Sequence, residues 1–240
     1  MPVGPAGLFP RSSALTPERR FVASVLGHLR RCDPDALRDE LDAGWSNELL
    51  VAFLRGDDDD TAKVAAACLG VVGTLEHSAA LAGALHHDDA VMVTMAEHAL
   101  WQIWFRSARP PACIKVAQAA HLIALQRFTE ARHLLDEAIG LAPDFAEAYN
   151  QRAIVYFLTD RFLESMADCK RVLRSNRWHF AARAGLGHCF AQLGQYTRAL
   201  GHYQAALRIH PRMDGIRQSI QQIRRTVKTA ALVPLPKTCR

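Results

Sequence analysis

Histidines that stand beside acidic residues are the part of this sequence whose types and spacing could bind a metal. The chain has 11 histidines, and three short segments combine them with carboxylates: Glu76-His77, His86-His87-Asp88-Asp89 and Glu97-His98. Imidazole and carboxylate groups are common ligands of zinc and iron. These segments offer too few matched ligands to close a coordination sphere, and histidines at helix ends and on the surface are the simpler interpretation. We therefore expect neither a metal nor a cofactor.

The known sequence motifs of catalysis are missing elsewhere in the chain. No GxSxG, GxxxxGKS/T or GxGxxG pattern occurs, which argues against a nucleophile elbow, a phosphate-binding loop and a dinucleotide site. The histidines of the second half have no cysteine or acidic partner at a spacing that would activate a nucleophile; they are His121, His133, His179, His188, His202 and His210. We predict that the protein is not an enzyme.

The acidic run Asp57–Asp60 raises the question of a calcium site. A calcium-binding loop needs alternating ligands, a central glycine and a terminal glutamate. Because the run lacks that arrangement, we predict that it caps the N-terminus of a helix instead.

The cysteines suggest a compartment and not a site. None of the six forms a CxxC pair: Cys32, Cys68, Cys113, Cys169, Cys189 and Cys239. These spacings indicate neither a disulfide framework nor a zinc site, so we expect a reducing, cytoplasmic location. The N-terminal residues lack the apolar segment of a signal peptide, and no apolar run approaches the roughly 20 residues of a membrane span.

The net charge of +5 hides two halves of opposite sign. Residues 1–110 have 10 Lys and Arg against 15 Asp and Glu, a net of −5, whereas residues 111–240 have 19 against 9, a net of +10. From Lys170 onward there are 14 basic residues and one acid, Asp214. Such asymmetry is expected of a surface that meets an anionic partner, and equally of helices whose charges are only solvated.

The elements that would position these residues are repeated helix pairs. Sliding the sequence by 34 residues aligns three consecutive segments without a gap, at 112–145, 146–179 and 180–213. Matching positions hold small, large apolar or aromatic residues, as in the columns Ala119/Ala153/Gly187, Leu122/Tyr156/Phe190 and Phe128/Phe162/Tyr196. Small residues allow two helices to approach closely. Each pair cannot bury its apolar faces alone, so the pairs must stack.

These columns resemble the tetratricopeptide repeat over 102 residues. The third segment carries the fullest pattern, with Leu186, Gly187, Phe190, Gly194, Tyr196, Ala199, Tyr203, Ala206 and Pro211. The sequence departs from the family pattern where Lys115 and Arg183 replace an aromatic residue, where Gln118 and Arg152 replace a leucine, and where Arg177 replaces a proline. The resemblance implies an α-α solenoid, the architecture of this family, and the departures weaken individual units without changing the fold.

A capping helix and a tail follow the repeats. Ile216, Ile220, Ile223 and Val227 lie at i, i+4, i+7 and i+11, so they form one apolar stripe on a helix. The resemblance implies that such a helix, at 214–228, covers the last repeat, and the repeat domain is then 112–228. Residues 229–240 have no such period, and we expect a flexible tail.

A second period, of 31 residues, precedes these units. Leu50 matches Leu81 and Leu69 matches Leu100, with acidic turns and Ala-rich helices between them. This pattern resembles HEAT-like helical repeats, and we assign 16–109 to such a region after a disordered arm at 1–15.

The two arrays meet at Pro110-Pro111. Trp101 and Trp104 are three residues apart and therefore lie on one helical face, suited to bury the junction. We expect an all-α protein, one continuous right-handed α-α solenoid of helix–turn–helix repeats that bends at this point.

The resemblance also implies a binding surface on the first helix of each pair. The residues that we expect to form a groove for a peptide or helix of another protein are Val116, Ile123, Glu147, Asn150, Ile154, Phe157, Leu158, His188 and Gln192. Family members that grip a chaperone's terminal carboxylate carry Lys, Arg and Asn there, whereas this chain has Val116, Ala120 and Ala181 at such positions. We predict a non-enzymatic adaptor that binds apolar anchors.

The alternative function uses the basic second half. An outer basic strip is expected from Lys170, Arg171, Arg174, Arg208, Arg224, Arg225 and Lys228. It would bind an acidic protein, RNA or another anionic surface. No aromatic stacking motif accompanies the strip, which makes nucleic acid the lesser choice.

Overall fold

The computed structural model describes residues 15–232. Thirteen α-helices and one short 3-10 turn, η1, form in this range, and no described residue lies in a strand. The all-α class and the α-α solenoid are thereby confirmed. The first array consists of α1 (Pro17–Arg31), α2 (Pro34–Gly44), α3 (Asn47–Leu54), α4 (Asp59–Val72), η1 (Leu75–His77), α5 (Ser78–Ala84) and α6 (Ala90–Phe105).

Side-chain caps set the starts of several helices in the first array. Thr16, Asp33 and Ser46 each accept a hydrogen bond from the backbone N–H three residues on, at the starts of α1, α2 and α3. Asp58 accepts from the Thr61 N–H at 3.2 Å at the start of α4. The acidic run Asp57–Asp60 therefore supplies a helix cap, as predicted.

The second array is three helix pairs followed by one helix. Its elements are α7 (Pro110–Ala124), α8 (Phe128–Leu141), α9 (Ala146–Leu158), α10 (Phe162–Ser175), α11 (Phe180–Gln192), α12 (Tyr196–Leu207) and α13 (Asp214–Leu232). Alanines of the small columns, such as Ala119 and Ala199, are completely buried. A Cβ at Gly187 would lie 2.5 Å from the Tyr203 ring. The close approach of α11 and α12 thus requires glycine.

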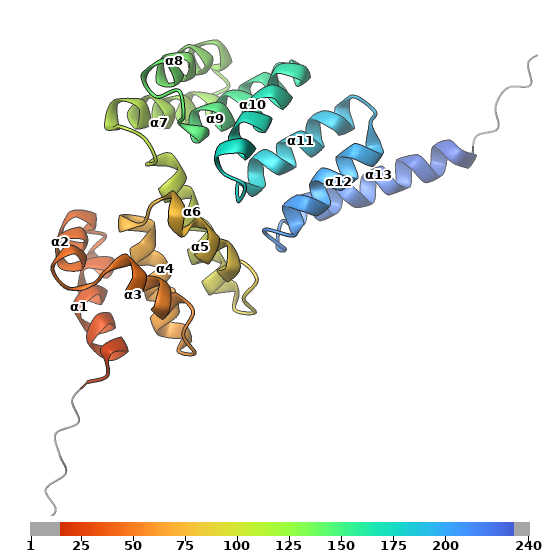
Figure 1. Ribbon diagram of the computed structural model, residues 1–240. Helices are drawn as coiled ribbons and strands as arrows, with labels where there is room; N and C mark the ends of the chain where they lie inside the picture. The colour runs from red at the N-terminus through yellow and green to blue at the C-terminus, as the bar shows by residue number, and fades with distance from the viewer. Residues whose placement is uncertain (1–14, 233–240) are drawn as a thin grey trace, which may run out of the picture.

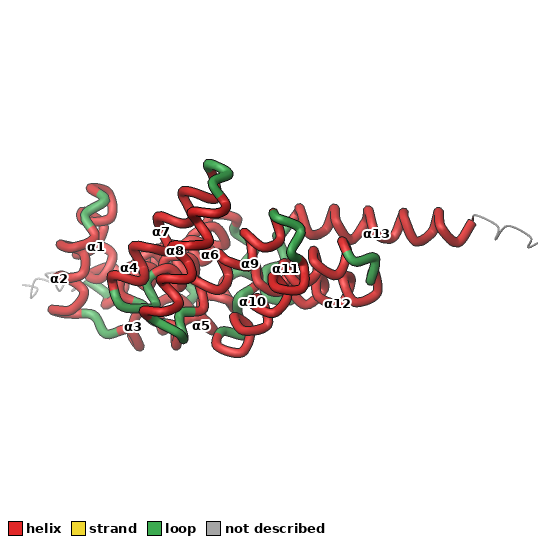
Figure 2. Tube along the Cα trace, turned by 90° about the horizontal axis from the view of Figure 1, so that it is seen from above, coloured by secondary structure: helices red, strands yellow, loops and turns green. Residues whose placement is uncertain are grey.

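Helix α13 covers the last pair and then extends beyond it (Figures 1 and 2). Its stripe of Ile216, Ile220 and Ile223 is buried, whereas Val227 is 45% exposed. The helix continues to Leu232, four residues past the predicted end at 228. The expected tail, 229–240, is thus helical in its first four residues, and its remainder lies outside the described residues. So does the expected arm at 1–15, except for Leu15.

The chain turns so sharply between the arrays that α6 contacts α7, α9 and the start of α11 (Figure 1). Trp104 is 1% exposed and stacks on His179 with ring centroids 4.2 Å apart. Trp101 contacts Phe180 edge-on at 5.7 Å. The two tryptophans bury the junction as predicted, but they pack against a unit far along the chain. The arrays therefore do not follow one another as a simple continuous row.

Polar contacts reinforce this docking. His210 lies 3.2 Å from the Glu97 carboxylate, which lowers the Glu97 pKa. His86 lies 3.1 Å from the Arg208 carbonyl oxygen, and Arg212 donates to the His87 carbonyl at 3.0 Å. Every one of these contacts joins the first array to the segment between α12 and α13. Among the described helices, none is long and apolar enough to cross a membrane.

Candidate functional site

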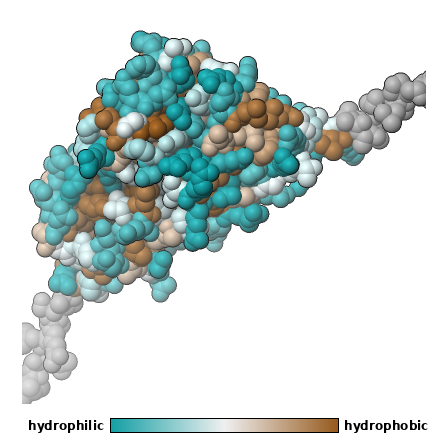
Figure 3. Space-filling view, turned by 45° about the horizontal axis from the view of Figure 1, so that its top comes forward, coloured by the Kyte–Doolittle hydropathy of each residue, from teal (hydrophilic) through white to brown (hydrophobic). Residues whose placement is uncertain are grey.

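A cavity of 280 Å³ opens on the second array, and we call it the groove cavity. Helix α9 supplies one wall, α11 the other, α10 the floor and the start of α13 one end. Its lining residues are Asn150, Ala153, Ile154, Phe157, Leu158, Ser165, Cys169, Ala181, Ala184, Gly185, His188, Met213 and Ile216. Figure 3 shows that apolar side chains on this view of the surface gather in separate patches among hydrophilic ones.

Five of the predicted groove residues line the groove cavity: Asn150, Ile154, Phe157, Leu158 and His188. Ile154 is 37% exposed and Leu158 is 47% exposed, and they lie one turn apart on α9. An apolar wall left open to solvent in this way suits a ligand that brings apolar side chains.

The other four predicted groove residues lie elsewhere. Val116 is fully buried and Ile123 is half-buried, both in the core of the first helix pair. Glu147 is also fully buried, and Gln192 lines a neighbouring cavity. The prediction was wrong for Val116, Ile123 and Glu147, because these side chains pack within and between the helix pairs.

Glu147 is the centre of a buried polar network. Its carboxylate accepts hydrogen bonds from Asn150 at 3.0 Å and Gln151 at 2.7 Å, and it lies 3.0 Å from His179 Nε2. His179 Nδ1 accepts the Ala182 N–H at 3.1 Å, so the ring proton belongs on Nε2, facing Glu147. The network holds α9 against the start of α11 beside the groove cavity. Asn150 is 3% exposed and donates one amide hydrogen inside this network.

Sequence reasoning missed the floor of the groove cavity. Ser165 and Cys169 lie one turn apart on α10, and the Cys189 thiol donates to Ser165 Oγ at 3.3 Å. A Cβ at Gly185 would lie 3.1 Å from Cys169 Sγ, so the small residue makes room for the thiol. Burial raises the pKa of Cys169 to about 12 and leaves it an unreactive thiol. The signal available in the sequence was the small residue Gly185 opposite Cys169.

A second cavity, of 510 Å³, adjoins the groove cavity, and we call it the polar cavity. His188 lines both cavities. Its Nδ1 lies 2.8 Å from the Tyr203 hydroxyl. Burial lowers the pKa of His188 and raises that of Tyr203 to about 12, so both groups are neutral near pH 7. Beyond His188 the polar cavity is lined chiefly by side chains of α13, among them Gln218, Gln222 and Arg225.

The predicted basic strip divides into different surroundings. Arg171 donates to Asp144 at 3.0 Å and Arg225 lines the polar cavity, so neither belongs to a free outer strip. Arg224 and Lys228 are exposed on the far part of α13. In contrast, four basic residues gather between α10, α11 and α12 with no ion pair in the described structure; this basic cluster is Lys170, Arg174, Arg183 and Arg208.

The acidic and histidine segments of the first array serve local contacts. His77 accepts the Thr74 N–H at 2.9 Å, His98 bonds Gln102 at 3.0 Å, and His87 lies 3.5 Å from Asp59. Asp89 pairs with Lys63 at 2.6 Å and caps α6. Within residues 15–232, no three His, Cys, Asp or Glu side chains come together in a way that would hold a metal ion.

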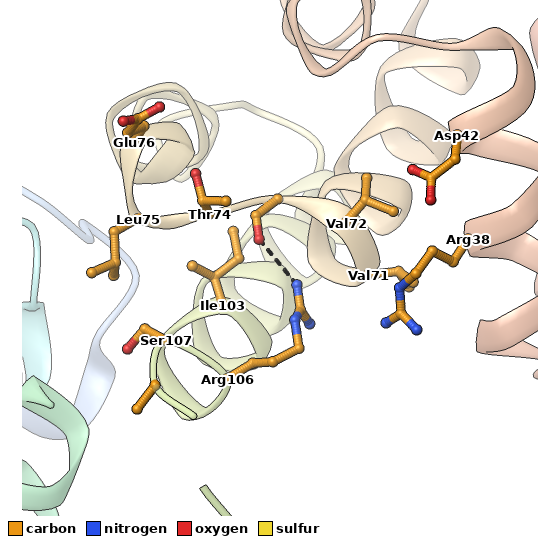
Figure 4. Close-up of a pocket in the computed structure, with 12 residues that line it drawn as sticks. Arg38, Asp42, Val71, Val72, Thr74, Leu75, Glu76, Ile103, Arg106 and Ser107 are labelled. Carbon is orange, nitrogen blue, oxygen red and sulfur yellow. Dashed lines mark hydrogen bonds between the residues drawn. The ribbon is translucent and has the colours of Figure 1, made fainter. Parts of the chain in front are cut away.

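A crevice of 770 Å³ lies where α2, α4 and the end of α6 meet (Figure 4). Arg106 points into it and donates to the carbonyl oxygens of Gly70 at 2.6 Å and Gly73 at 3.1 Å. Burial, together with the nearby Arg38 guanidinium, lowers the Arg106 pKa. Arg106 is thereby committed to the C-terminal carbonyls of α4, and Arg38 pairs with Asp35 at 3.3 Å. The crevice is explained by helix capping.

The comparisons with known proteins match the second array. A tetratricopeptide-repeat family model matches residues 116–178 and 170–214. A TPR repeat-containing protein of Rhizobium etli is 32% identical over 108 residues, which is 45% of this chain and 53% of that protein. The anaphase-promoting complex subunit 3 of Schizosaccharomyces pombe is 29% identical over 93 residues, 38% of this chain and 14% of that protein. The chain thus spans about half of the first relative and a small part of the second.

The similarity extends to a solved structure. The TPR domain of Sgt2 from Aspergillus fumigatus has a TM-score of 0.50 and 16% identity, covering 55% of this chain and 88% of that domain. At this identity the likeness concerns the fold. Together with the family-model match, the helix pairs and their small columns, it identifies the chain as a tetratricopeptide-repeat protein, with the repeats in residues 116–214.

Proposed function

We propose that the protein is a non-enzymatic adaptor whose groove cavity binds a segment of another protein. The observation that carries the proposal is the pair of open apolar side chains, Ile154 and Leu158, on the wall of a 280 Å³ cavity. A cavity of this size holds one or two large apolar side chains. Burying such an anchor is worth about 1.5–3 kcal/mol for each side chain.

The chemistry of the groove cavity supports binding over catalysis. Its lining has no acidic or basic residue, and its thiol, Cys169, is held protonated by burial. The polar groups that reach the cavity, from Asn150 and His188, are suited to hydrogen-bond a peptide backbone.

The experiment that tests the proposal places a charge in the groove cavity. The variant Ile154→Glu with Phe157→Glu should lose the partners that the wild-type chain retains in affinity capture followed by mass spectrometry. Leu163→Glu is the matched control, because Leu163 is 70% exposed and lies outside the cavity. Equal thermal unfolding midpoints for both variants would show that the fold is intact. Retention of every partner by the double variant would refute groove binding.

A second candidate function is favoured by the basic cluster. Arg183 Nε is buried without a hydrogen-bond partner, and Arg208 lies close enough to lower the Arg183 pKa. Unpaired basic groups held together are stabilised by a bound anion. We infer that the alternative ligand is an acidic protein surface or RNA.

The alternative has its own test. Binding to single-stranded RNA should weaken steeply with salt and should be abolished by Lys170→Glu with Arg174→Glu. Arg171→Glu is the control, because Arg171 is already paired with Asp144. Absence of binding at low salt would remove RNA as a ligand.

We also infer a reducing, cytoplasmic setting. Cys68, Cys169 and Cys189 are buried free thiols, which is the usual state of cysteine in the cytosol. Fractionation that recovers the chain with an oxidised, extracellular pool would contradict this assignment.

A further inference from the structure

We propose that the ligand is an extended peptide with an apolar anchor and, about four residues away, an acidic side chain. This inference rests on the proposed function and specifies its ligand. The anchor occupies the groove cavity, and the rest of the peptide crosses the polar cavity along α13. Two features carry the inference: His188 belongs to both cavities, and Arg225 lines the far part of the polar cavity.

The polar cavity is suited to a peptide backbone. Gln192 of α11 faces it from one side, and Gln218, Gln221 and Gln222 of α13 face it from the other. A primary amide both donates and accepts hydrogen bonds, so it can pair with the N–H and the C=O groups of an extended chain. A cavity rich in glutamine therefore fits the backbone between anchor and acid and tolerates many side chains there.

His188 provides a directed donor where the cavities meet. The Tyr203 hydroxyl lies 2.8 Å from His188 Nδ1. We assign the phenol proton to this hydrogen bond, which leaves the ring proton on Nε2. A neutral imidazole in this tautomer donates from Nε2, and a ligand carbonyl is the acceptor that it fits.

The spacing follows from the geometry of α13. Ile216 lines the groove cavity and Arg225 lines the polar cavity. Nine helical residues separate them, and at 1.5 Å per residue this is about 13 Å along the helix. An extended peptide advances about 3.3 Å per residue, so about four residues bridge the two sites.

Charge complementarity selects an acid for the far position. Neither cavity has an acidic lining residue, and after Asp214 the chain contains no Asp or Glu. Arg224 and Lys228 are exposed on the same part of α13 as Arg225. A ligand carboxylate here meets only basic side chains, whereas a basic ligand residue would be repelled.

The test is selection of a random 12-residue peptide library, displayed on phage, against the full chain. We expect recovered peptides to combine a Leu, Ile or Phe with an Asp or Glu about four positions away. A synthetic peptide from this pool should bind about tenfold more weakly to Arg225→Gln, a loss within the range of measured charge pairs. The same peptide with Asn or Gln in place of its acid should bind wild type and Arg225→Gln equally. Arg224→Gln is the control, since Arg224 does not line the cavity.

Other outcomes separate this inference from the proposed function. Peptides that lose binding to Ile154→Glu but carry no spaced acid would overturn the inference and leave groove binding intact. An Arg225→Gln effect that is equal for acidic and neutral peptides would overturn it as well. A library that yields no peptide sensitive to Ile154→Glu would refute groove binding together with the inference.

Discussion

The indole of Trp104 stacks on the imidazole of His179, with ring centroids 4.2 Å apart and planes inclined by 19°. The same imidazole accepts the Ala182 N–H at the start of α11 and faces Glu147 of α9. One side chain therefore joins the first array, the start of the third helix pair and the wall of the groove cavity. The orientation of the two arrays and the shape of the groove cavity depend on the same contact.

Removal of this contact should destabilise the protein strongly. Trp104→Ala leaves a large cavity at a residue that is 1% exposed, and we expect the free energy of unfolding to fall by about 3–5 kcal/mol. Urea denaturation monitored by circular dichroism measures the loss. Trp178→Ala, at a half-buried tryptophan outside the array contact, should cost less than half as much. Equal losses for the two variants would show that the array contact contributes little.

Arg152, which departs from the family pattern, should stabilise the stack through Asp168. It donates to both Asp168 oxygens, at 2.8 and 2.9 Å, and to Asp136 at 2.8 Å. Asp168→Ala leaves a partly buried guanidinium short of partners and should cost about 1–3 kcal/mol of unfolding free energy. Asp136→Ala, at a side chain 40% exposed, should cost under about 1 kcal/mol. Thermal denaturation of both variants that ranked them in the reverse order would contradict this view of Arg152.

Two glycines should respond to alanine with opposite signs. Gly187→Ala brings a Cβ to within 2.5 Å of the Tyr203 ring, and overpacking of this kind costs about 1–3 kcal/mol. A Cβ at Gly201 on α12 would meet open space, so Gly201→Ala should stabilise by about 0.5–1 kcal/mol through helix propensity. Chemical denaturation gives both values. A neutral Gly187→Ala would mean that α11 and α12 do not approach as closely as described.

The cysteines should differ sharply in reactivity. Cys32 is exposed, whereas burial raises the pKa of Cys68 and of Cys169 to about 12. Because the thiolate is the nucleophile, brief treatment with iodoacetamide at pH 8 should label Cys32 and spare the other two. Peptide mass spectrometry reads out the sites, and labelling in urea serves as the control for intrinsic reactivity. Rapid native labelling of Cys169 would show that the floor of the groove cavity is open.

The helix pairs could be predicted because their packing repeats with the sequence. A small residue must stand wherever two helices approach closely, and the column that contains Gly187 shows this directly. The apolar stripe at Ile216, Ile220 and Ile223 likewise marks a helix with one buried face. Periodicity did not indicate the end of α13, because Ala and Leu after residue 228 favour a helix by propensity without forming a stripe.

The docking of the two arrays could not be predicted from repeats. A repeat pattern reports contacts between neighbours, whereas Trp104 meets His179 across a sharp turn of the chain. The same limit explains Glu147, which was expected in the groove and is buried by its bonds to His179 and Gln151. Arg225 was expected on the outer side, and only the path of α13 places it beside the polar cavity.

Site-specific photo-cross-linking compares the groove wall with the opposite surface most directly. A benzophenone amino acid in place of Leu158 or of Leu163 probes two exposed leucines on either side of the turn between α9 and α10. The groove account predicts covalent adducts from position 158 that disappear with Ile154→Glu, and none from position 163. Adducts that form equally at both positions, or that persist with Ile154→Glu, would contradict it.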